Sequence, residues 1–510
     1  MGPPGLVDVE AVVGFRAWRV RLAMRTSAPS WVLPLSLGML SGLGLLSVIG
    51  APLLVVTLSV LMARLRCLSP SQAASWTAPF ALGFFGLHLQ WLFPSLNSIL
   101  GAPAGLLLLP VVLLLAGGLT LTVWLTRLLT GHFFLLALPA AWILFDWLRT
   151  LGPLAFPWGS VGYAASRTAA VQLASIGGVP LLGGLVLGSA ALLAHREVRS
   201  ALLAVALWAG AWLLGTVLTL PAAAPARTAL LVQGSIDPMA RFRGTVDATR
   251  LYQSLTRTAR SGSPPDLVVW PEGALPSPPD RPASWLQLSL PGVPLITGAS
   301  ETQDGAFHNS AFALSAAGVF RYDKVHTVPF GETFPGRDAF DWLYRPVFAA
   351  LGIPGLRNVT PGTRSSTLQA GRLLYAVSIC YESVFPGLAR RAVNDGGQVL
   401  VTLSNDAWFG RTAGAEQHFL MGRVRAIETR RFWLRVGNDG ITAVTDPAGR
   451  VQGRLARSDR GALVAGFTPR NDQTLYVRFG DWVVLVAAAL MLACGGRKAV
   501  VQRVASKGVL

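Results

Sequence analysis

Residues 373–386 read LLYAVSICYESVFP, an apolar run that stops at a cysteine and is followed by a short polar stretch and a proline. This pattern predicts a strand over Leu373–Ile379 that turns directly into a helix over residues 383–394. Cys380 is therefore expected at a helix N-terminus, where backbone amides and the helix dipole favour the thiolate. The stretch predicts a reactive cysteine at the end of a strand.

Two further polar residues close apolar runs in the same way. Glu272 closes the strand-like run at residues 267–271, and Lys324 closes the run at residues 319–323. A thiol, a carboxylate and an ammonium group are the nucleophile, the base and the cation that thiol acyl chemistry needs. The sequence thus offers one group of each type at three strand ends.

The composition is that of a membrane protein. Apolar residues make up 52% of the 510 residues, and the mean hydropathy is +0.50. The formal net charge of +18 raises the question of nucleic acid. Here the arginines cluster beside apolar spans, which is the distribution expected of cytoplasmic loops. An ordinary soluble enzyme and a nucleic-acid-binding protein are therefore both disfavoured.

Lysine and cysteine are rare. Only three of the 43 basic residues are lysines, and Lys324 is the single one outside the C-terminal tail, which suggests that this position needs a compact ammonium group. The three cysteines, at positions 67, 380 and 494, have no metal-ligand spacing. Neither a structural disulfide nor a cysteine-based zinc site is expected.

The membrane part is expected to contain eight spans, since a helix needs about 17–25 apolar residues to cross a bilayer. The spans are predicted at residues 31–48, 50–63, 75–94, 103–126, 131–148, 170–193, 201–219 and 480–496. The first two could instead be one overlong helix broken at residues 50–52. The distribution of charge favours eight spans.

With eight spans, the cations that flank them gather on one side. That side carries Arg16, Arg19, Arg21, Arg25, Arg64, Arg66, Arg127, Arg196, Arg199, Arg497, Lys498, Arg503 and Lys507. The short connections on the other side carry only Arg149 and Arg167. The positive-inside rule then places both termini in the cytoplasm, as an N-terminal segment 1–30 and a tail 497–510. A cleaved signal peptide is not expected, because the first apolar stretch continues into a second without a good cleavage site.

Residues 31–219 thus form a membrane domain with seven spans, residues 480–496 the last span, and residues 220–479 one domain outside the cytoplasm. Strands are predicted there at 229–232, 266–270, 293–297, 310–314, 319–322, 373–379, 399–404 and 441–445, and helices at 246–260, 383–394 and 414–431. Alternating strands and helices, with hairpin-like strand pairs, predict an α/β or α+β sandwich.

Two aromatic-rich segments are expected at the membrane surface. Residues 334–366 are rich in proline, glycine and aromatic residues and are predicted to be a long loop or arm. The loop at 149–169 contains Phe156, Trp158 and Tyr163, which are side chains typical of the bilayer interface. The two segments are expected to frame a lateral opening to lipid; the alternative is ordinary interfacial anchoring.

Several motifs occur together and in a fixed order. They are Phe156-Pro157-Trp158, Gln233-Gly234, Trp270-Pro271-Glu272, Lys324 with Pro329-Phe330-Gly331-Glu332, Cys380-Tyr381-Glu382 and the run at residues 403–410. Through them the chain resembles the nitrilase superfamily and, within it, its membrane-embedded branch, the apolipoprotein N-acyltransferases. The resemblance covers nearly the whole chain and implies that the extracytoplasmic domain is an αββα nitrilase-like sandwich.

The resemblance implies a role for each motif residue. Cys380 would attack an ester carbonyl and hold the acyl group as a thioester. Glu272 would take the thiol proton and later deprotonate an incoming amine, and Lys324 would stabilise the oxyanion together with a backbone amide near Tyr381. Glu332 would support this triad.

Four more residues belong to the expected supporting or substrate-binding set. Tyr381 and Glu382 match positions that shape the pocket, and Trp270 lies in the motif of the base. The family usually has a tryptophan, which helps to retain the acyl chain, where this sequence has Phe242. An aromatic ring remains there, but the indole donor is lost, so this difference bears on the handling of the acyl donor.

The function implied is ping-pong transfer of an acyl chain from a glycerophospholipid, through Cys380, to the α-amine of a diacylglyceryl-cysteine at the N-terminus of a lipoprotein. A membrane-tethered amidase or other hydrolase with the same triad is the first alternative. A transporter or receptor is the second, but it would need ionisable residues along the spans, and these offer little beyond Asp146 and His88.

No cofactor or metal is expected, and nothing in the sequence demands an oligomer, so a monomer is predicted. His308, His326 and His418 invite a Cys–His protease reading, but the family pattern needs no histidine and we expect them to be structural. The resemblance implies a multi-pass protein of the bacterial inner membrane with its catalytic domain on the periplasmic side. Its partners would be the bilayer, a phospholipid donor and a lipoprotein acceptor.

Overall fold

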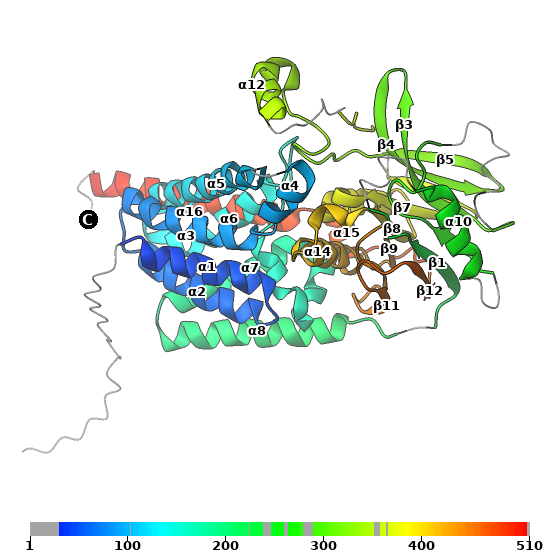
Figure 1. Cartoon of the computed structure of the whole chain (residues 1–510). Coiled ribbons are helices and arrows are strands. Elements are labelled where there is room, and N and C mark those ends of the chain that lie inside the picture. The colour runs from blue at the N-terminus through cyan, green and yellow to red at the C-terminus, as the bar shows by residue number, and fades with distance from the viewer. Residues whose placement is uncertain are drawn as a thin grey trace, which may run out of the picture.

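The computed structural model of the chain describes residues 30–101, 104–222, 224–237, 246–259, 264–278, 288, 290–350, 358–363 and 366–506. A bundle of long helices and a domain with two sheets lie end to end (Figure 1). The expected N-terminal segment 1–30, apart from its last residue, and Phe242 fall outside the described residues.

One helix of the bundle overlaps each predicted span. The helices are α1 (Val32–Leu46), α2 (Gly50–Leu65), α3 (Pro70–His88), α5 (Leu108–Thr130), α6 (Phe134–Leu148), α7 (Ala174–Ala194), α8 (Val198–Leu218) and α16 (Trp482–Ser506). By length and composition alone, three described stretches are able to cross a membrane: Ala104–Leu148, Ala169–Ala194 and Val198–Leu218. The helices α1 and α2 are shorter apolar helices.

Two predicted spans differ most from the helices in the structure. The third, expected at 75–94, is broken, because α3 ends at His88 and a separate short helix, α4 (Leu92–Leu100), follows. The last helix, α16, continues to Ser506, ten residues past the predicted end of its span at 496.

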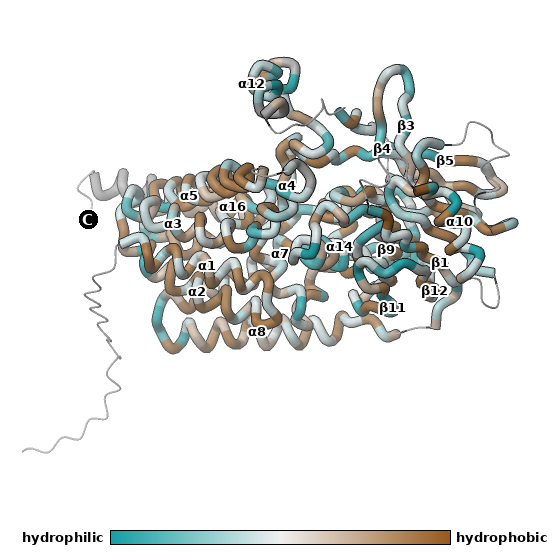
Figure 2. Tube along the Cα trace, viewed as in Figure 1, coloured by the Kyte–Doolittle hydropathy of each residue, from teal (hydrophilic) through white to brown (hydrophobic). Residues whose placement is uncertain are grey.

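The outside of the bundle is apolar (Figure 2). On α8, Leu202 is 63% exposed and Val205 is 66% exposed, and many other leucines of the bundle are as open. Such a surface is an aggregation liability in water, whereas the hydrocarbon core of a bilayer covers it. The pattern fits helices that face lipid.

The α/β domain is built on two six-stranded sheets with the orders β12-β1-β2-β3-β4-β5 and β11-β10-β9-β8-β7-β6. The strands of the first sheet are β1 (Arg227–Gln233), β2 (Leu267–Val269), β3 (Leu295–Gln303), β4 (Ala306–Ser315), β5 (Gly318–Asp323) and β12 (Gly461–Phe467). Those of the second are β6 (Thr367–Ala370), β7 (Leu373–Ile379), β8 (Val399–Ser404), β9 (Trp433–Gly437), β10 (Thr442–Thr445) and β11 (Val451–Leu455).

In each sheet three neighbouring strands run parallel, namely β1, β2 and β3 in the first and β7, β8 and β9 in the second. The outer strand pairs are antiparallel. Because parallel strands end at the same edge of a sheet, polar residues that follow β2 and β7 come to lie at such edges.

The two sheets pack face to face, and helices cover their outer faces. Leu231 and Val269 of the first sheet share one buried cluster with Val377 and Val401 of the second. The helix α10 (Ala248–Thr258) packs on the outer face of the first sheet, and α13 (Pro386–Asn394) and α14 (Gly414–Thr429) pack on the second. These layers are the helix–sheet–sheet–helix sandwich that was predicted.

The eight predicted strands and three predicted helices of this domain all overlap observed elements. Four further strands, β6, β9, β11 and β12, were not predicted. The loop expected at 334–366 was wrong in part, because Arg337–Ala350 form the helix α12, with a kink at Phe340. Figure 1 shows α12 standing apart from the two sheets.

Candidate active site

Cys380 directly follows the last residue of β7 and has a left-handed backbone conformation, with a φ of 50°. Residues other than glycine seldom adopt this conformation, and strain of this kind is concentrated at functional sites. The residues that follow form only a five-residue 3-10 helix, η5 (Cys380–Val384), before α13 begins. The thiol therefore lies at a helix N-terminus, as predicted, but the helix is a short 3-10 turn and not the α-helix expected at 383–394.

The thiol of Cys380 holds its proton at neutral pH. Burial raises its pKa, the carboxylate of Glu272 raises it further, and Lys324 offsets only part of the rise. Burial and the neighbouring carboxylate thus disfavour the thiolate that was expected from the sequence. A base must remove the proton as the sulfur attacks.

Glu272 is the carboxylate placed to do so. It comes three residues after β2, and a hydrogen bond with the side chain of Cys380 acts on its carboxyl group. Burial raises the pKa of Glu272, whereas Lys324 and the hydrogen bonds from Asn309 and Cys380 lower it. A raised pKa makes a carboxylate a better acceptor for a thiol proton.

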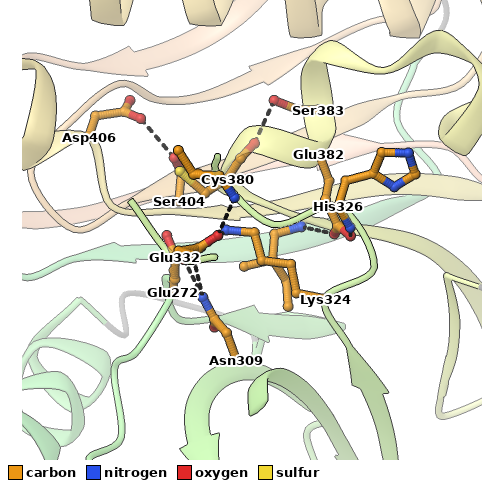
Figure 3. Close-up of polar contacts among 12 residues, drawn as sticks. Glu272, Asn309, Lys324, His326, Glu332, Cys380, Glu382, Ser383, Ser404 and Asp406 are labelled. Carbon is orange, nitrogen blue, oxygen red and sulfur yellow. Dashed lines mark hydrogen bonds and ion pairs between the residues drawn. The ribbon is translucent and has the colours of Figure 1, made fainter. Parts of the chain in front are cut away.

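Lys324 follows β5 and is almost completely buried. Its Nζ lies 2.7 Å from Oε1 of Glu332 and 3.7 Å from Oε1 of Glu272. Burial alone would lower the pKa of Lys324, but the two carboxylates outweigh it and raise the pKa. The side chain is therefore a permanent cation beside Cys380. Figure 3 shows Glu272, Lys324 and Glu332 gathered on one side of Cys380.

Glu332 holds the lysine in place. Its Oε1 accepts the hydrogen bond from Lys324, and its Oε2 accepts one from the backbone N–H of Val328 at 2.8 Å. The carboxylate thus ties the ammonium group to the loop after β5, which removes much of the rotamer freedom of a long side chain.

Asn309 is a site residue that the sequence analysis missed. It lies on β4, and its Nδ2 donates to Oε1 of Glu272 at 2.7 Å and to Oε1 of Glu332 at 3.2 Å. Oε2 of Glu272 has no hydrogen-bond partner of standard geometry among the described residues, which leaves this atom open to accept a proton. The sequence held one hint of this role, because Asn309 is a polar residue directly before the strand predicted at 310–314. That strand, β4, pairs with β5, which leads to Lys324.

Glu382 acts on the backbone rather than on a substrate. Its Oε1 accepts hydrogen bonds from the Tyr322 hydroxyl and from the N–H groups of Val325 and His326, and its Oε2 accepts one from Ile379. It therefore fastens the loop that carries Lys324 to the end of the strand that carries Cys380. Figure 3 shows its carboxylate next to His326, away from the thiol.

Among the described residues, no group of three or more His, Cys, Asp or Glu side chains could hold a metal ion. What the site contains is a protonated buried thiol, a base in contact with it and a fixed cation. Together these groups can attack a carbonyl carbon and stabilise the oxyanion that forms.

Comparison with known proteins identifies the family. The carbon-nitrogen hydrolase family model matches residues 231–471, and the apolipoprotein N-acyltransferase N-terminal domain matches residues 37–192. The apolipoprotein N-acyltransferase of Vibrio parahaemolyticus is 30% identical over an alignment of 472 positions, which covers 87% of this chain and 92% of the relative. That of Methylococcus capsulatus is 34% identical over 84% of this chain and 88% of the relative.

The chain belongs to the apolipoprotein N-acyltransferase family. It is therefore an acyltransferase enzyme built on a nitrilase-superfamily domain, and the transporter and receptor readings are excluded. Among solved structures, the yeast Saccharomyces cerevisiae protein Nit3, a member of branch 10 of the nitrilase superfamily, is 18% identical with a TM-score of 0.35, over 49% of this chain and 93% of that chain.

In this acyltransferase, Tyr381 points from the site toward the helical bundle. Its hydroxyl donates to the backbone oxygen of Ala155 at 2.5 Å. Its ring stacks on Trp158, with centroids 5.7 Å apart and planes 10° from parallel, and Phe385 packs edge-on at 5.1 Å. Tyr381 thus joins the nucleophile loop to the membrane-side loop 149–169.

Trp270 supports the fold of the acyltransferase and is not placed to touch a substrate. Its fully buried ring stacks on Tyr252 of α10 at 5.6 Å, and its Nε1 donates to Thr256. Because side chains alternate along a strand, Trp270 faces the outer helix while Val269 faces the other sheet. The ring therefore has no free surface, and its role is to anchor the strand end before Glu272.

Proposed function

We propose that this acyltransferase transfers a fatty acyl chain from a glycerophospholipid to Cys380 and then to the α-amine of the S-diacylglyceryl-cysteine at the N-terminus of a lipoprotein. One observation carries the proposal: a membrane helical bundle is fused to a domain in which Glu272, Lys324 and Cys380 meet. The names of the relatives supply the acceptor class.

The first half-reaction forms a thioester. Sγ of Cys380 attacks the ester carbonyl carbon, and Glu272 takes the thiol proton. The oxyanion that develops faces the fixed ammonium group of Lys324, which lowers the barrier without reorganisation. The C–O bond of the ester then breaks, Glu272 returns the proton to the departing oxygen, and a lysophospholipid leaves.

The second half-reaction consumes the thioester. The amine of the acceptor attacks the acyl carbon, Glu272 accepts a proton from the nitrogen, and the C–S bond breaks to give an amide. The thiolate recovers a proton, and the free enzyme is restored. A thioester suits this step because an amine opens it readily while water attacks it only slowly.

The membrane arrangement belongs to the same proposal. It comprises a cytoplasmic segment 1–30, seven spans within 31–219, an extracytoplasmic catalytic domain 220–479, an eighth span at 480–496 and a cytoplasmic tail 497–510. The eight helices that overlap these spans and the one-sided distribution of flanking cations support it. The site would then lie at the periplasmic surface of the inner membrane, in a monomer.

The donor would enter sideways from the bilayer. On α12, Phe340 is 49% exposed and Trp342 is 71% exposed, and aromatic rings of this kind prefer the bilayer interface. The loop 149–169 reaches Cys380 through the contact of Trp158 with Tyr381. These two segments would frame the opening, and simple anchoring of α12 in the interface is the alternative.

The test is an intact-mass spectrum of the purified enzyme after incubation with phospholipid. We expect a hydroxylamine-labile acyl adduct that Cys380→Ala abolishes and that Cys67→Ala, a matched change at an exposed cysteine, leaves intact. The match to the carbon-nitrogen hydrolase family makes an amidase the second candidate. Cleavage of small amides without any acyl adduct would support that candidate and overturn the transferase.

A further inference from the structure

Asp406, which Figure 3 shows on the side of Cys380 opposite to Lys324, belongs to a buried polar cluster. The cluster consists of Asp406, which follows β8, His418 on α14 and Arg435 on β9, and none of the three side chains has solvent exposure. The carboxylate of Asp406 accepts hydrogen bonds from Arg435 at 2.5 Å and from Ser404 at 2.7 Å. Buried charges are costly, so a complete network at this place needs a reason.

The network ends on the backbone of the nucleophile. Nε2 of His418 lies 3.0 Å from the carbonyl oxygen of Cys380, and the hydroxyl of Ser383 donates to the same oxygen at 2.9 Å. On the other side of the ring, Nδ1 lies 3.1 Å from Asp406 and 3.2 Å from Arg435. The imidazole therefore connects a fixed ion pair to the carbonyl group of Cys380.

A proton on Nε2 completes the contact with the nucleophile's backbone. The carbonyl oxygen of Cys380 is an acceptor only, so the 3.0 Å hydrogen bond requires Nε2 of His418 to donate. Nδ1 faces both Asp406, at 3.1 Å, and Arg435, at 3.2 Å. Burial and Arg435 lower the pKa of His418, whereas Asp406 and the Cys380 carbonyl raise it. Without a proton on Nε2, the single hydroxyl of Ser383 would have to serve both Nε2 and the carbonyl oxygen, and one buried acceptor would stay unpaired.

Holding this carbonyl fixes a second group. The peptide unit between Cys380 and Tyr381 is planar, and its C=O and N–H point in opposite directions. Two donors on the carbonyl oxygen of Cys380 therefore aim the N–H of Tyr381 toward the opposite side. That N–H lies in the first turn of η5, where no earlier carbonyl of the same helix can accept it. It is available to an oxyanion on the acyl carbon.

We propose that His418, held by Asp406 and Arg435, is a positioning residue that orients the Cys380–Tyr381 peptide so that the N–H of Tyr381 stabilises the oxyanion opposite Lys324. The role rests on the proposed acyl chemistry at Cys380. Asp406 suits it, because burial alone would raise its pKa while Arg435 and His418 hold the pKa well below the usual range. Both effects favour the ionised carboxylate that pairs with Arg435 at 2.5 Å.

The experiment compares two reactions of the same thiol. Acylation by an ester passes through an oxyanion, whereas alkylation by iodoacetamide displaces iodide and forms none. In His418→Leu we expect acylation to slow by about 100-fold, the usual effect of losing an oxyanion donor, while alkylation keeps its rate. His418→Gln, whose amide N–H can reach toward the same carbonyl, should recover part of the acylation rate.

Two further variants keep the comparison sound. Ser383→Ala removes the other donor to the Cys380 carbonyl without disturbing the ion pair, and it should show the same split with a smaller loss. His308→Leu is the matched control. Like His418, His308 bonds a backbone carbonyl, here that of Thr360 at 2.9 Å, but among the described residues no hydrogen bond joins it to η5. It should leave both rates unchanged.

The esters are a phospholipid and a small p-nitrophenyl ester. Equal falls in the acylation and alkylation rates of His418→Leu would mean that His418 only maintains the fold. An unchanged acylation rate would mean that His418 does not orient the oxyanion donor. Either result overturns the proposal. A wild-type enzyme that reacts with the p-nitrophenyl ester but not with phospholipid would count against the proposed function alone. In that case the ester series still decides the role of His418.

Discussion

Asn309 bonds both carboxylates of the site through one amide nitrogen. Its bond to Glu272, at 2.7 Å, lowers the pKa of that carboxyl group, whereas burial raises it. A hydrogen bond to a charged group contributes about 1.5–3 kcal/mol. Asn309 therefore helps to keep the base ionised, and its loss should move the balance toward the protonated, inactive form.

For Asn309→Leu, we predict that the acid limb of the kcat/KM profile moves to higher pH. Loss of the donor raises the pKa of Glu272, and the base is unprotonated only above its pKa. At neutral pH we expect kcat/KM to fall by about tenfold, equivalent to about 1.4 kcal/mol. The pH–rate profile is the measurement. Asn394→Leu removes an amide that bonds the Val477 carbonyl and the Gln473 side chain, outside the site, and serves as the control. An acid limb that stays in place in Asn309→Leu would contradict the role.

At this scale, the sequence predicts residues that follow a strand better than residues within one. Glu272, Lys324 and Cys380 each interrupt an apolar run at its end, and the structure brings all three together. Asn309 lies inside a strand, where a single polar residue looks like ordinary alternation. The orientation of the His418 ring depends on three elements that are distant in sequence, so no local pattern could reveal it.

Among the secondary-structure elements, the loop 149–169 and the helix η5 form one unit. Arg149 donates to the backbone oxygens of Phe156 and Trp158 and pairs with Asp146 of α6 at 2.6 Å. These contacts hold the loop to the end of α6. Tyr381 then packs on Trp158. A displacement of the membrane-side loop would therefore reach the residue next to the nucleophile.

Tyr381→Phe tests this connection. The change keeps the stacked ring but leaves the oxygen of buried Ala155 without its donor, at a cost of about 1–3 kcal/mol. We predict that acylation by bilayer phospholipid slows about tenfold, while alkylation of Cys380 by a small soluble reagent keeps its rate. Tyr252→Phe removes a comparable buried bond, to Asn438 at 2.9 Å, and should not produce this difference. An equal loss in both reactions would show that the contact serves stability alone.

The elements that escaped prediction have physical reasons in common. The strand β9 contains Arg435 at its centre, and a charged residue there breaks the apolar pattern by which a strand is recognised. Only the structure shows that Arg435 is paired with Asp406. The strand β11 is mostly exposed and therefore lacks an apolar signal. In α12, Pro346 and a kink at Phe340 break the helical pattern, so the segment resembles a loop.

For the whole molecule, the main question is how the catalytic domain is held against the bundle. Arg430 has a left-handed conformation and lies at the junction. Its guanidinium donates to Gln172 and Ser175 at the start of the sixth predicted span and to the backbone oxygen of Leu218 at the end of α8. Burying such a group without these partners would be strongly unfavourable, so the junction between the catalytic domain and the bundle is specific.

This fixed junction makes the proposed orientation testable with two cysteines. Cys67 is exposed between α2 and α3 and is predicted to be cytoplasmic, whereas Thr302 is exposed on β3 of the catalytic domain. A membrane-impermeant maleimide should label Thr302→Cys but not Cys67 in spheroplasts, and the preference should reverse in inverted vesicles. The Cys67→Ala variant should lose the label in inverted vesicles, which would assign that label to Cys67. Five predicted spans separate residues 67 and 302, and an odd number of crossings places the two positions on opposite sides of the bilayer. Labelling of both positions from the same side would require an even number of crossings between them and would overturn the eight-span arrangement.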